Sequence, residues 1–220
     1  MKREIQITGD GSTSIFIPEL NEGYHSRHGA IQEAYHVFIK NGLELFSKQE
    51  LSILEIGFGT GLNAFITYLE TKKSKQTIDY VGIEAYPVEN EHVLQMNYVQ
   101  QLDALDEQKV FNHIHTSNWE TKTELSKHFF LTKRKQFFQD IQDSDTYDLI
   151  YFDAFGYTVQ PELWSEAIFK IMYQSLKKNG VLVTYACRSS IKNAMLAVGF
   201  TIEKLPGAPG KREMLRATKK

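Results

Sequence analysis

The chain has 220 residues, 42% of them hydrophobic, which is enough to bury one substantial core and short for two. A single cysteine, Cys187, excludes an internal disulfide and a cysteine-rich zinc site, and the formal net charge of −2 is not that of a general nucleic-acid-binding polycation. No apolar run approaches the roughly 18 residues of a membrane span, and the N-terminus lacks the apolar core of a secretory signal, so we expect no membrane contact and a cytoplasmic location.

The first 48 residues predict a small cap on the main domain. The segment EIQITGDGSTSIFIPEL has apolar residues on both sides of a GDGS turn, which predicts a β-hairpin. Residues 30–47 follow with apolar residues at helical spacing. We therefore expect one domain over residues 1–220, with a hairpin and helix cap (1–48) laid against an α/β core (49–220).

From residue 49 onward, strands and helices are expected to alternate. LSILEIG, IDYVGIEA, YDLIYFDAF and GVLVTYA predict buried strands, and HFFLTKRK predicts a further strand in the otherwise featureless region 103–140. Helices are expected at 62–72, from about 87 to 102, at 161–178 with an end at Asn-Gly, and at 189–199.

The chain closes with FTIEKL and REMLRAT, two strands that are joined by a PGAPGK turn and must therefore be antiparallel. Alternating strands and helices imply a mostly parallel sheet covered on both faces. We predict a Rossmann-like class I α/β fold with seven strands and an antiparallel C-terminal edge. This ending favours the methyltransferase form of the doubly wound sheet over the dehydrogenase form.

The strongest chemical signal is the sequence Glu55-Ile-Gly-Phe-Gly-Thr-Gly61, which lies between a predicted strand and a predicted helix. Its three glycines permit a sharp turn and a close approach of the backbone to a ligand. A dinucleotide fingerprint would need glycine at position 62, where the chain has leucine. Glu55 suits an ammonium group, which S-adenosylmethionine carries in its methionine part. The motif predicts a site for that cofactor, and a glycine turn that only packs is the alternative.

Two acidic residues stand at the ends of predicted strands, where ligands bind in such sheets. Glu84 ends IDYVGIEA, at the position where a carboxylate accepts hydrogen bonds from the two ribose hydroxyls of a ligand. Asp153 ends the strand in LIYFDAFG, where it could orient an amine nucleophile and help its proton leave. The alternatives are an ordinary surface glutamate and an aspartate that caps the following loop.

Other features are weaker. The pairs His25/His28 and His113/His115 have chelating spacing but no acidic or thiolate partner nearby, so we expect no metal site. The basic residues from position 188 onward outnumber two acidic ones, which predicts either a solvated end or a patch that faces RNA phosphates: Arg188, Lys192, Lys204, Lys211, Arg212, Arg216, Lys219 and Lys220. Four aromatic residues could stack on a base or belong to the core: Tyr24, Phe155, Tyr157 and Trp164.

These motifs together resemble the methyltransferase family that completes the 5-methylaminomethyl-2-thiouridine modification at the tRNA wobble position. The matching segments cover nearly the whole chain in the family's order: LNEGYHSRHGAIQEAYHVFI, LEIGFGTGLN, GIEAYP, YDLIYFDAFGYTVQPELW, GVLVTY and PGAPGKREMLRA. The DAF…QPELW and GKREML segments are specific to this family, whereas most methyltransferases share the glycine motif.

The resemblance implies transfer of a methyl group from S-adenosyl-L-methionine to the primary amine of 5-aminomethyl-(2-thio)uridine in the anticodon region of tRNA. Asp153 would be the catalytic residue, between cofactor and amine. The expected cofactor contacts are Glu55, Gly57, Gly59, Gly61, Asn63, Glu84, Asp153, Phe155 and Tyr24. The expected substrate or RNA contacts are His25, Ser26, Trp164, Arg188, Lys192, Lys211, Arg212 and Glu213.

Two segments depart from the family pattern. After GVLVTY the family often has Lys-Gly followed by Val-Arg-Arg, whereas residues 188–193 here read RSSIKN, with one basic residue fewer. Before YDLIYFDAF the family tends to carry Gly-Asp near the adenine, whereas residues 135–138 here read KQFF, so no adenine contact is assigned. Some relatives are fused to a flavin-dependent oxidase; this chain ends at the methyltransferase, so we expect no FAD and an oxidase partner on a separate chain.

Two other functions remain open at this stage. A small-molecule amine transferase of the polyamine-synthase kind would share the sheet, the glycine loop and an acidic residue after a similar strand, without needing a basic C-terminal region. A cofactor-fold protein that has lost catalysis would bind only RNA or a partner, although the presence of Glu55, Glu84 and Asp153 argues against it.

Overall fold

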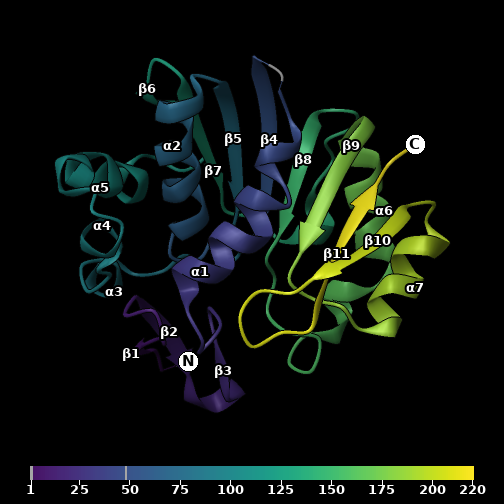
Figure 1. Ribbon diagram of the computed structural model, residues 1–220, viewed down its shortest axis with the longest axis horizontal. Helices are drawn as coiled ribbons and strands as arrows, with labels where there is room; N and C mark the ends of the chain where they lie inside the picture. The colour runs from purple at the N-terminus through teal and green to yellow at the C-terminus, as the bar shows by residue number, and fades with distance from the viewer. Residues whose placement is uncertain (1, 48) are drawn as a thin grey trace.

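The computed structural model describes residues 2–47 and 49–220, and its centre is a twisted eight-stranded sheet (Figure 1). In spatial order the strands are β10 (Thr201–Pro206), β11 (Glu213–Thr218), β9 (Leu176–Thr184), β8 (Tyr147–Phe152), β4 (Glu50–Ile56), β5 (Thr77–Ile83), β7 (Phe129–Arg134) and β6 (Thr123–Ser126). Six of them run in the same direction, and β11 and β6 run the opposite way. The mostly parallel α/β sheet is thus confirmed, with one strand more than expected because β6 adds to the edge at β7.

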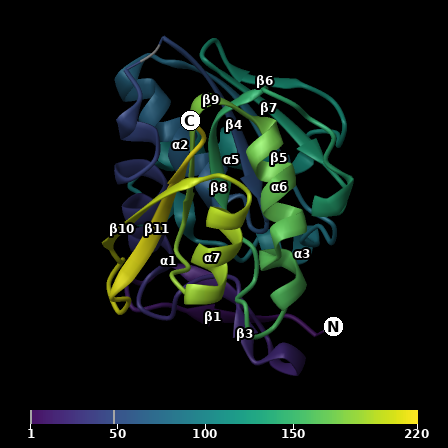
Figure 2. The ribbon, with the colours of Figure 1, turned by 90° about the vertical axis from the view of Figure 1, so that its right-hand side faces the viewer.

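Helices cover both faces of the sheet, as the near-continuous apolar strands require. One face packs against α2 (Leu62–Ser74) and α5 (Gln108–Thr116), and the other against α6 (Glu166–Ser175) and α7 (Ser189–Ala197) (Figure 2). Two buried apolar clusters result, one on each face. None of the helices among the described residues has the length and apolar content to cross a membrane.

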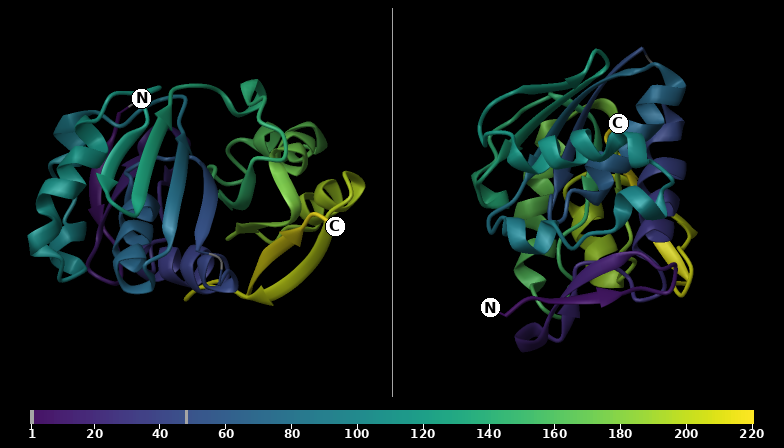
Figure 3. Two further views of the ribbon diagram at one scale, coloured as in Figure 1. Left: turned by 90° about the horizontal axis from the view of Figure 1, so that it is seen from above. Right: turned by 90° about the vertical axis from the view of Figure 1, so that its left-hand side faces the viewer.

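The N-terminal segment forms a small three-stranded sheet of β1 (Glu4–Ile7), β2 (Thr13–Ile17) and β3 (Glu22–Gly23), followed by α1 (Ala30–Ala34) and a π-helical turn over Tyr35–Lys40. The predicted hairpin is β1 and β2, which pair antiparallel. Figure 1 and the right view of Figure 3 place this sheet below the carboxyl ends of the parallel strands. The expected boundary between cap and core, at residue 48, lies outside the described residues.

Three expected helices differ from the structure. The helix expected at 161–178 is a 3₁₀ turn (Pro161–Trp164) followed by α6, which ends at Ser175. The Asn-Gly pair instead forms an irregularity inside β9, where Asn179 has a φ of 64° and its N–H donates to the Lys219 carbonyl. Asn-Gly marks a backbone position with positive φ, and such positions occur in strand bulges as well as at helix ends.

The helix expected from 87 to 102 is two short ones, α3 (Asn90–Val93) and α4 (Tyr98–Gln101). Asn97 lies between them. Its side chain accepts a hydrogen bond from the Thr13 N–H and donates one to the Gly11 carbonyl, and these bonds tie the break between the two helices to the cap. The helix expected over 30–47 ends at Lys40. Sequence patterns missed α5, β6 and short 3₁₀ turns at Pro18–Leu20, Leu43–Leu45, Leu105–Glu107 and Phe138–Asp140.

Candidate functional site

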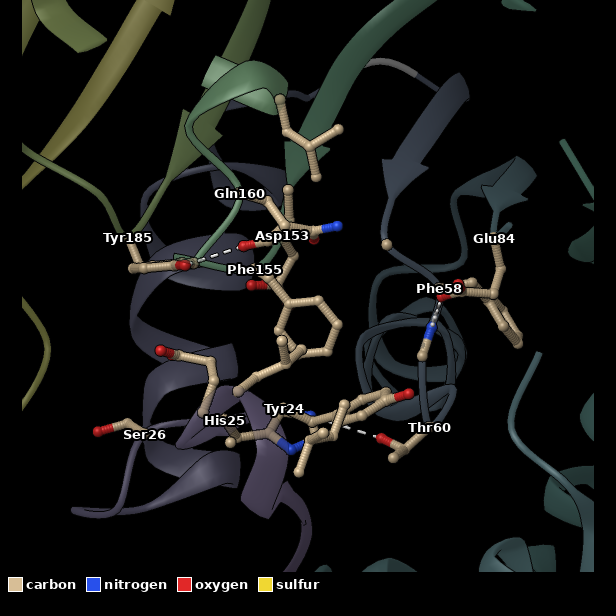
Figure 4. Close-up of a pocket in the computed structure, with 18 of the residues that line it drawn as sticks. Tyr24, His25, Ser26, Phe58, Thr60, Glu84, Asp153, Phe155, Gln160 and Tyr185 are labelled. Atoms are coloured by element: carbon tan, nitrogen blue, oxygen red, sulfur yellow. Dashed lines mark hydrogen bonds between the residues drawn. The ribbon is translucent and has the colours of Figure 1, made fainter. Parts of the chain in front are cut away.

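A cavity of about 690 Å³ lies between the cap and the carboxyl ends of β4, β5 and β8. Its position is the one at which ligands bind in doubly wound sheets, and its size is that of a pocket for a drug-sized molecule. Figure 4 shows side chains from both sides converging on it: Glu84 and Asp153 from the strand ends, and Tyr24 and His25 from the cap.

The glycine loop after β4 forms one wall of the cavity. Gly57 and Gly59 have φ values of +85° and +49°, which side-chain-bearing residues rarely adopt. A Cβ at residue 57 would lie 2.6 Å from the Asp153 carbonyl oxygen, so this glycine allows the loop to pack against the end of β8. Gly61, with a φ of +69°, precedes α2 and does not line the cavity. The expected role of the loop fits Gly57 and Gly59, and Gly61 sets the start of the helix.

Asn63 on α2 joins two carboxyl groups. Its amide nitrogen lies 2.9 Å from Glu55 Oε1 and 2.9 Å from Asp153 Oδ2, and it donates to both. Glu55 is fully buried, does not line the cavity and also accepts a hydrogen bond from Tyr80. The residue that was expected to touch the ligand therefore lies behind the wall and positions Asn63, which does line the cavity.

Glu84 lines the cavity immediately after β5, as expected. Its Oε2 accepts the Gly59 N–H at 3.0 Å and its Oε1 accepts the Tyr86 N–H at 2.9 Å (Figure 4). A carboxylate has about four acceptor sites, so two backbone donors fix its orientation and leave capacity for two ligand hydroxyls. The geometry suits the expected ribose contact.

Asp153 follows β8 and lines the cavity. Burial, followed by the negative charge of Glu33, raises the pKa of its carboxyl to about 7, against the opposing effects of the Asn63 hydrogen bond and of Lys211. A carboxyl group with a pKa near neutrality can accept a proton and release it again at physiological pH.

The cap contributes three of the expected residues, Tyr24, His25 and Ser26, which all line the cavity. The Tyr24 ring meets the Phe155 ring edge-on, with centroids 5.1 Å apart, and closes over the glycine loop. His25 is 2.9 Å from Ser14 Oγ, and burial lowers the pKa of its imidazole to about 4, so the ring is neutral at pH 7. This histidine is held as part of the wall and offers no positive charge to a substrate.

The structure also brings together residues that the sequence did not group. Lys211, in the turn before β11, forms an ion pair with Glu33 of α1, and its Nζ lies 3.9 Å from the centre of the Tyr185 ring. All three line the cavity. Glu33 is 178 positions away from Lys211 in the chain, so no local pattern could have predicted the pair.

The 135–138 segment also reaches the cavity, through Phe137 and Phe138. Phe137 is exposed and meets the exposed ring of Tyr86 edge-on, beside Glu84. The segment that lacked an assigned adenine contact thus supplies aromatic surface at the ribose end of the cavity. The signal in the sequence was an aromatic residue shortly after each of two predicted strands, Tyr86 after IDYVGIEA and Phe137 after HFFLTKRK.

Five expected substrate or RNA contacts lie outside the cavity wall: Trp164, Arg188, Lys192, Arg212 and Glu213. Trp164 is 1% exposed, packs on Phe152 and donates its indole N–H to the Phe155 carbonyl, so it supports the wall and is not free to stack on a base. Packing between α6 and the sheet decided its burial. Glu213 pairs with Lys204 on the surface.

The residues that are present fit S-adenosyl-L-methionine. Asn63 Oδ1 is buried and has no hydrogen-bond partner, so the pocket presents an unsatisfied acceptor that an ammonium group could satisfy. Glu84 is oriented for ribose hydroxyls, and a Cβ at Gly59 would come within 3.2 Å of the Tyr24 ring, so the loop has no room for a side chain there. The cavity therefore offers hydrogen-bond acceptors for the ammonium group and for the ribose hydroxyls of the cofactor.

Comparison with known proteins gives the same chemistry. A family model described as S-adenosyl-L-methionine-dependent methyltransferase matches residues 110–220. A protein of Leptospira borgpetersenii, named tRNA 5-methylaminomethyl-2-thiouridine biosynthesis bifunctional protein MnmC, is 29% identical over 87% of this chain. A protein of Actinobacillus pleuropneumoniae with the same name is 28% identical over 90% of it. This chain spans 31% and 32% of their lengths, about a third.

Two solved structures resemble the whole chain in fold. MNMC2 from Aquifex aeolicus has a TM-score of 0.79 at 21% identity, and the match covers 100% of this chain and 70% of that one. Spermidine synthase from Thermotoga maritima has a TM-score of 0.56 at 10% identity, with 100% and 72% covered. At these identities both show the fold alone.

Proposed function

The chain belongs to the S-adenosyl-L-methionine-dependent methyltransferase family whose model matches residues 110–220, and we propose that its acceptor is the primary amine of 5-aminomethyl-(2-thio)uridine at the tRNA wobble position. The names of the MnmC relatives support that substrate. The observation that carries the proposal is the Asp153 carboxyl group, which lines the cavity at the strand end beside the glycine loop and is held by the Asn63 amide. An amine acceptor needs such a group because it must lose a proton before it can form a bond to carbon.

When bound, S-adenosyl-L-methionine supplies a methyl group on positively charged sulfur, and transfer to an amine breaks the carbon–sulfur bond with its electron pair left on sulfur. The chain's own residues prepare the acceptor. Asp153 Oδ2 is fixed by the Asn63 amide, and its carboxylate accepts the proton of the substrate ammonium, which frees the nitrogen lone pair. The Tyr24 ring packs on Gly59 of the glycine loop and meets the Phe155 ring edge-on, so the two rings form an apolar part of the wall around the acceptor.

Basic residues around the cavity support a polyanionic substrate. Arg27 and Lys211 line it, and Arg212 is exposed in the same turn as Lys211. Several other C-terminal basic residues are already neutralised: Arg216 pairs with Glu203, and Lys219 with Asp145. The proposed phosphate contacts are therefore those of Arg27, Arg188, Lys192 and Arg212. We further propose a cytoplasmic location, where tRNA is modified, and a separate flavin-dependent oxidase as a partner in the pathway.

The test is transfer of labelled methyl from S-adenosyl-L-methionine to tRNA from cells blocked before this step. Nucleoside digestion and mass analysis should locate the methyl on 5-aminomethyl-2-thiouridine, and tRNA that lacks the aminomethyl group should receive none. Putrescine serves as a small diamine acceptor in parallel. Methylation of the diamine with none of the tRNA would overturn the proposed substrate and favour a small-molecule amine transferase.

A further inference from the structure

Lys211 and Glu33 form a charge pair in the wall of the cavity. Glu33 lies in α1 and is 8% exposed; one of its carboxylate oxygens accepts the Ser26 N–H at 3.0 Å, and the other accepts from Lys211 Nζ. The ammonium group of Lys211 also lies over the face of the Tyr185 ring. Tyr185 in turn donates its hydroxyl to the carbonyl of Ala154, the residue after Asp153. The pair is therefore held in the wall of the cavity that Asp153 also lines.

The turn that carries Lys211 has little freedom. Gly210 has a φ of +82°, and a Cβ there would lie 2.0 Å from the His28 ring. A Cβ at Gly207 would lie 2.5 Å from the Lys211 carbonyl oxygen. The backbone at both ends of the turn is thus packed against the cap and against itself, so that the lysine is presented to the cavity from a defined position.

Carboxyl groups outnumber cationic side chains around Asp153 and Lys211. The titratable and charged side chains near these two residues include Glu22 of β3, Arg27 and His28 of the following segment, Glu33 of α1, Glu55 of β4, Tyr80 of β5 and Tyr185 after β9. Glu33 and Lys211 act on the Asp153 carboxyl in opposite senses, since Glu33 disfavours its ionised form and Lys211 favours it. Both charges therefore act on the carboxyl group that is proposed to accept the proton of the acceptor nitrogen.

We propose that Lys211, held by Glu33 and the Tyr185 ring, is a positioning residue that keeps the acceptor amine unprotonated in the site. An alkylamine is largely protonated at neutral pH. A fixed positive charge beside it disfavours the ammonium form, as a neighbouring cation does for nucleophilic lysines. The proton moves from the substrate nitrogen to the Asp153 carboxylate, and the lone pair stays on nitrogen, free to form the bond to carbon. Glu33 holds the lysine in place and limits the size of this effect.

The inference rests on the proposed amine acceptor and gives a prediction about sign. Removing the positive charge with Lys211→Met should raise the pKa values of both the bound amine and Asp153. The acid limb of the kcat profile, which reports groups in the enzyme–substrate complex, should then move to higher pH, by about 0.5 to 1 unit. Removing the negative charge with Glu33→Gln should move it to lower pH. Lys211→Arg keeps the charge and should leave the limb in place, and the double variant Glu33→Gln/Lys211→Met should return it towards the wild-type position.

Lys122→Met is the matched control, because it removes a lysine from an ion pair with Asp79 at the far end of β5. It should not move the profile. If Lys211→Met and Glu33→Gln lose activity while the acid limb stays at the wild-type pH in both variants, the pair has a structural role and the inference is overturned. Limbs that move in the same direction would also overturn it, since opposite charges must act in opposite senses.

A second readout does not depend on turnover. In protein labelled with ¹³C at aspartate Cγ, the Asp153 signal is assigned by its loss in Asp153→Asn and then titrated by NMR. We expect its pKa to rise in Lys211→Met and fall in Glu33→Gln. If wild-type enzyme does not methylate the tRNA but Asp153 shifts in these two directions, the proposed substrate fails and the electrostatic coupling stands. If Asp153 does not respond to either change, the coupling fails whatever the substrate is.

Discussion

The two walls of the cavity are built on different principles. On the sheet side, Gly57, Gly59, Glu84 and Asp153 each stand within a few residues of the end of a parallel strand, and backbone N–H groups or the Asn63 amide hold the carboxylates. On the cap side, Tyr24 meets Phe155 and Glu33 pairs with Lys211, so each contact joins segments that are remote in sequence. The sheet wall fits a cofactor that a broad family of enzymes shares. The cap wall can differ between enzymes with different acceptors while the sheet wall stays the same.

The largest expected effect separates chemistry from cofactor binding at the sheet wall. Asp153→Asn keeps the shape of the side chain but cannot accept a proton, so methyl transfer should fall by about 100- to 10,000-fold. The Kd for S-adenosyl-L-methionine, measured by calorimetry, should change much less. A loss of cofactor affinity as large as the loss of rate would make Asp153 a binding group and remove its role as proton acceptor.

A second change tests whether the glycine loop is constrained by the fold. Gly57→Ala places a Cβ 2.6 Å from the Asp153 carbonyl oxygen at a φ of +85°, so we expect a loss of about 1–3 kcal/mol in the free energy of unfolding and a large drop in cofactor affinity. Gly156→Ala, where the nearest atom is 3.6 Å away, is the matched control. Denaturant titration and calorimetry compare the two, and equal tolerance of both would contradict the packing argument.

A third change sharpens the contrast within the basic C-terminal region. Arg212→Ala removes an exposed charge beside the cavity, so tRNA affinity should fall several-fold and the slope of log K against log salt should drop by about one. Lys219→Ala removes a lysine that is already paired with Asp145, and should change neither quantity. Filter binding at several salt concentrations measures both. Equal losses would show that the C-terminal charge acts as a whole.

A fourth prediction concerns the dependence of stability on pH. The pKa of Asp153 is about 7 in the folded protein against an ordinary value of 3.8, so between about pH 4 and 7 the folded state holds a proton that the unfolded state has lost. The contribution of this group to the free energy of unfolding therefore falls as pH rises through that window. Asp153→Asn should remove this dependence and stabilise the protein at pH 8 relative to wild type. Thermal unfolding at pH 5 and pH 8 checks the difference, and an unchanged difference between the two pH values would show that the carboxyl is not perturbed.

Local sequence patterns were sufficient to predict the sheet wall. Glycine at 57 and 59 and acidic residues at 84 and 153 follow buried strands directly, and a strand in a parallel sheet delivers the next residues to a known edge. The conformation at each of these positions depends on near neighbours in the chain, so local patterns were sufficient. The same reasoning found the hairpin, β4, β5, β8 and the final antiparallel pair.

The other features depend on contacts between distant segments of the chain. The end of α6 at Ser175 depends on β9 pairing with its neighbours, and the break between α3 and α4 depends on Asn97 hydrogen bonding to the cap. Trp164 is buried because α6 packs on the sheet, and Lys211 meets Glu33 because the last turn folds back onto α1. In each case the contact joins segments far apart in the chain, and its free energy is available only after those segments have packed together, so no local pattern can reveal it.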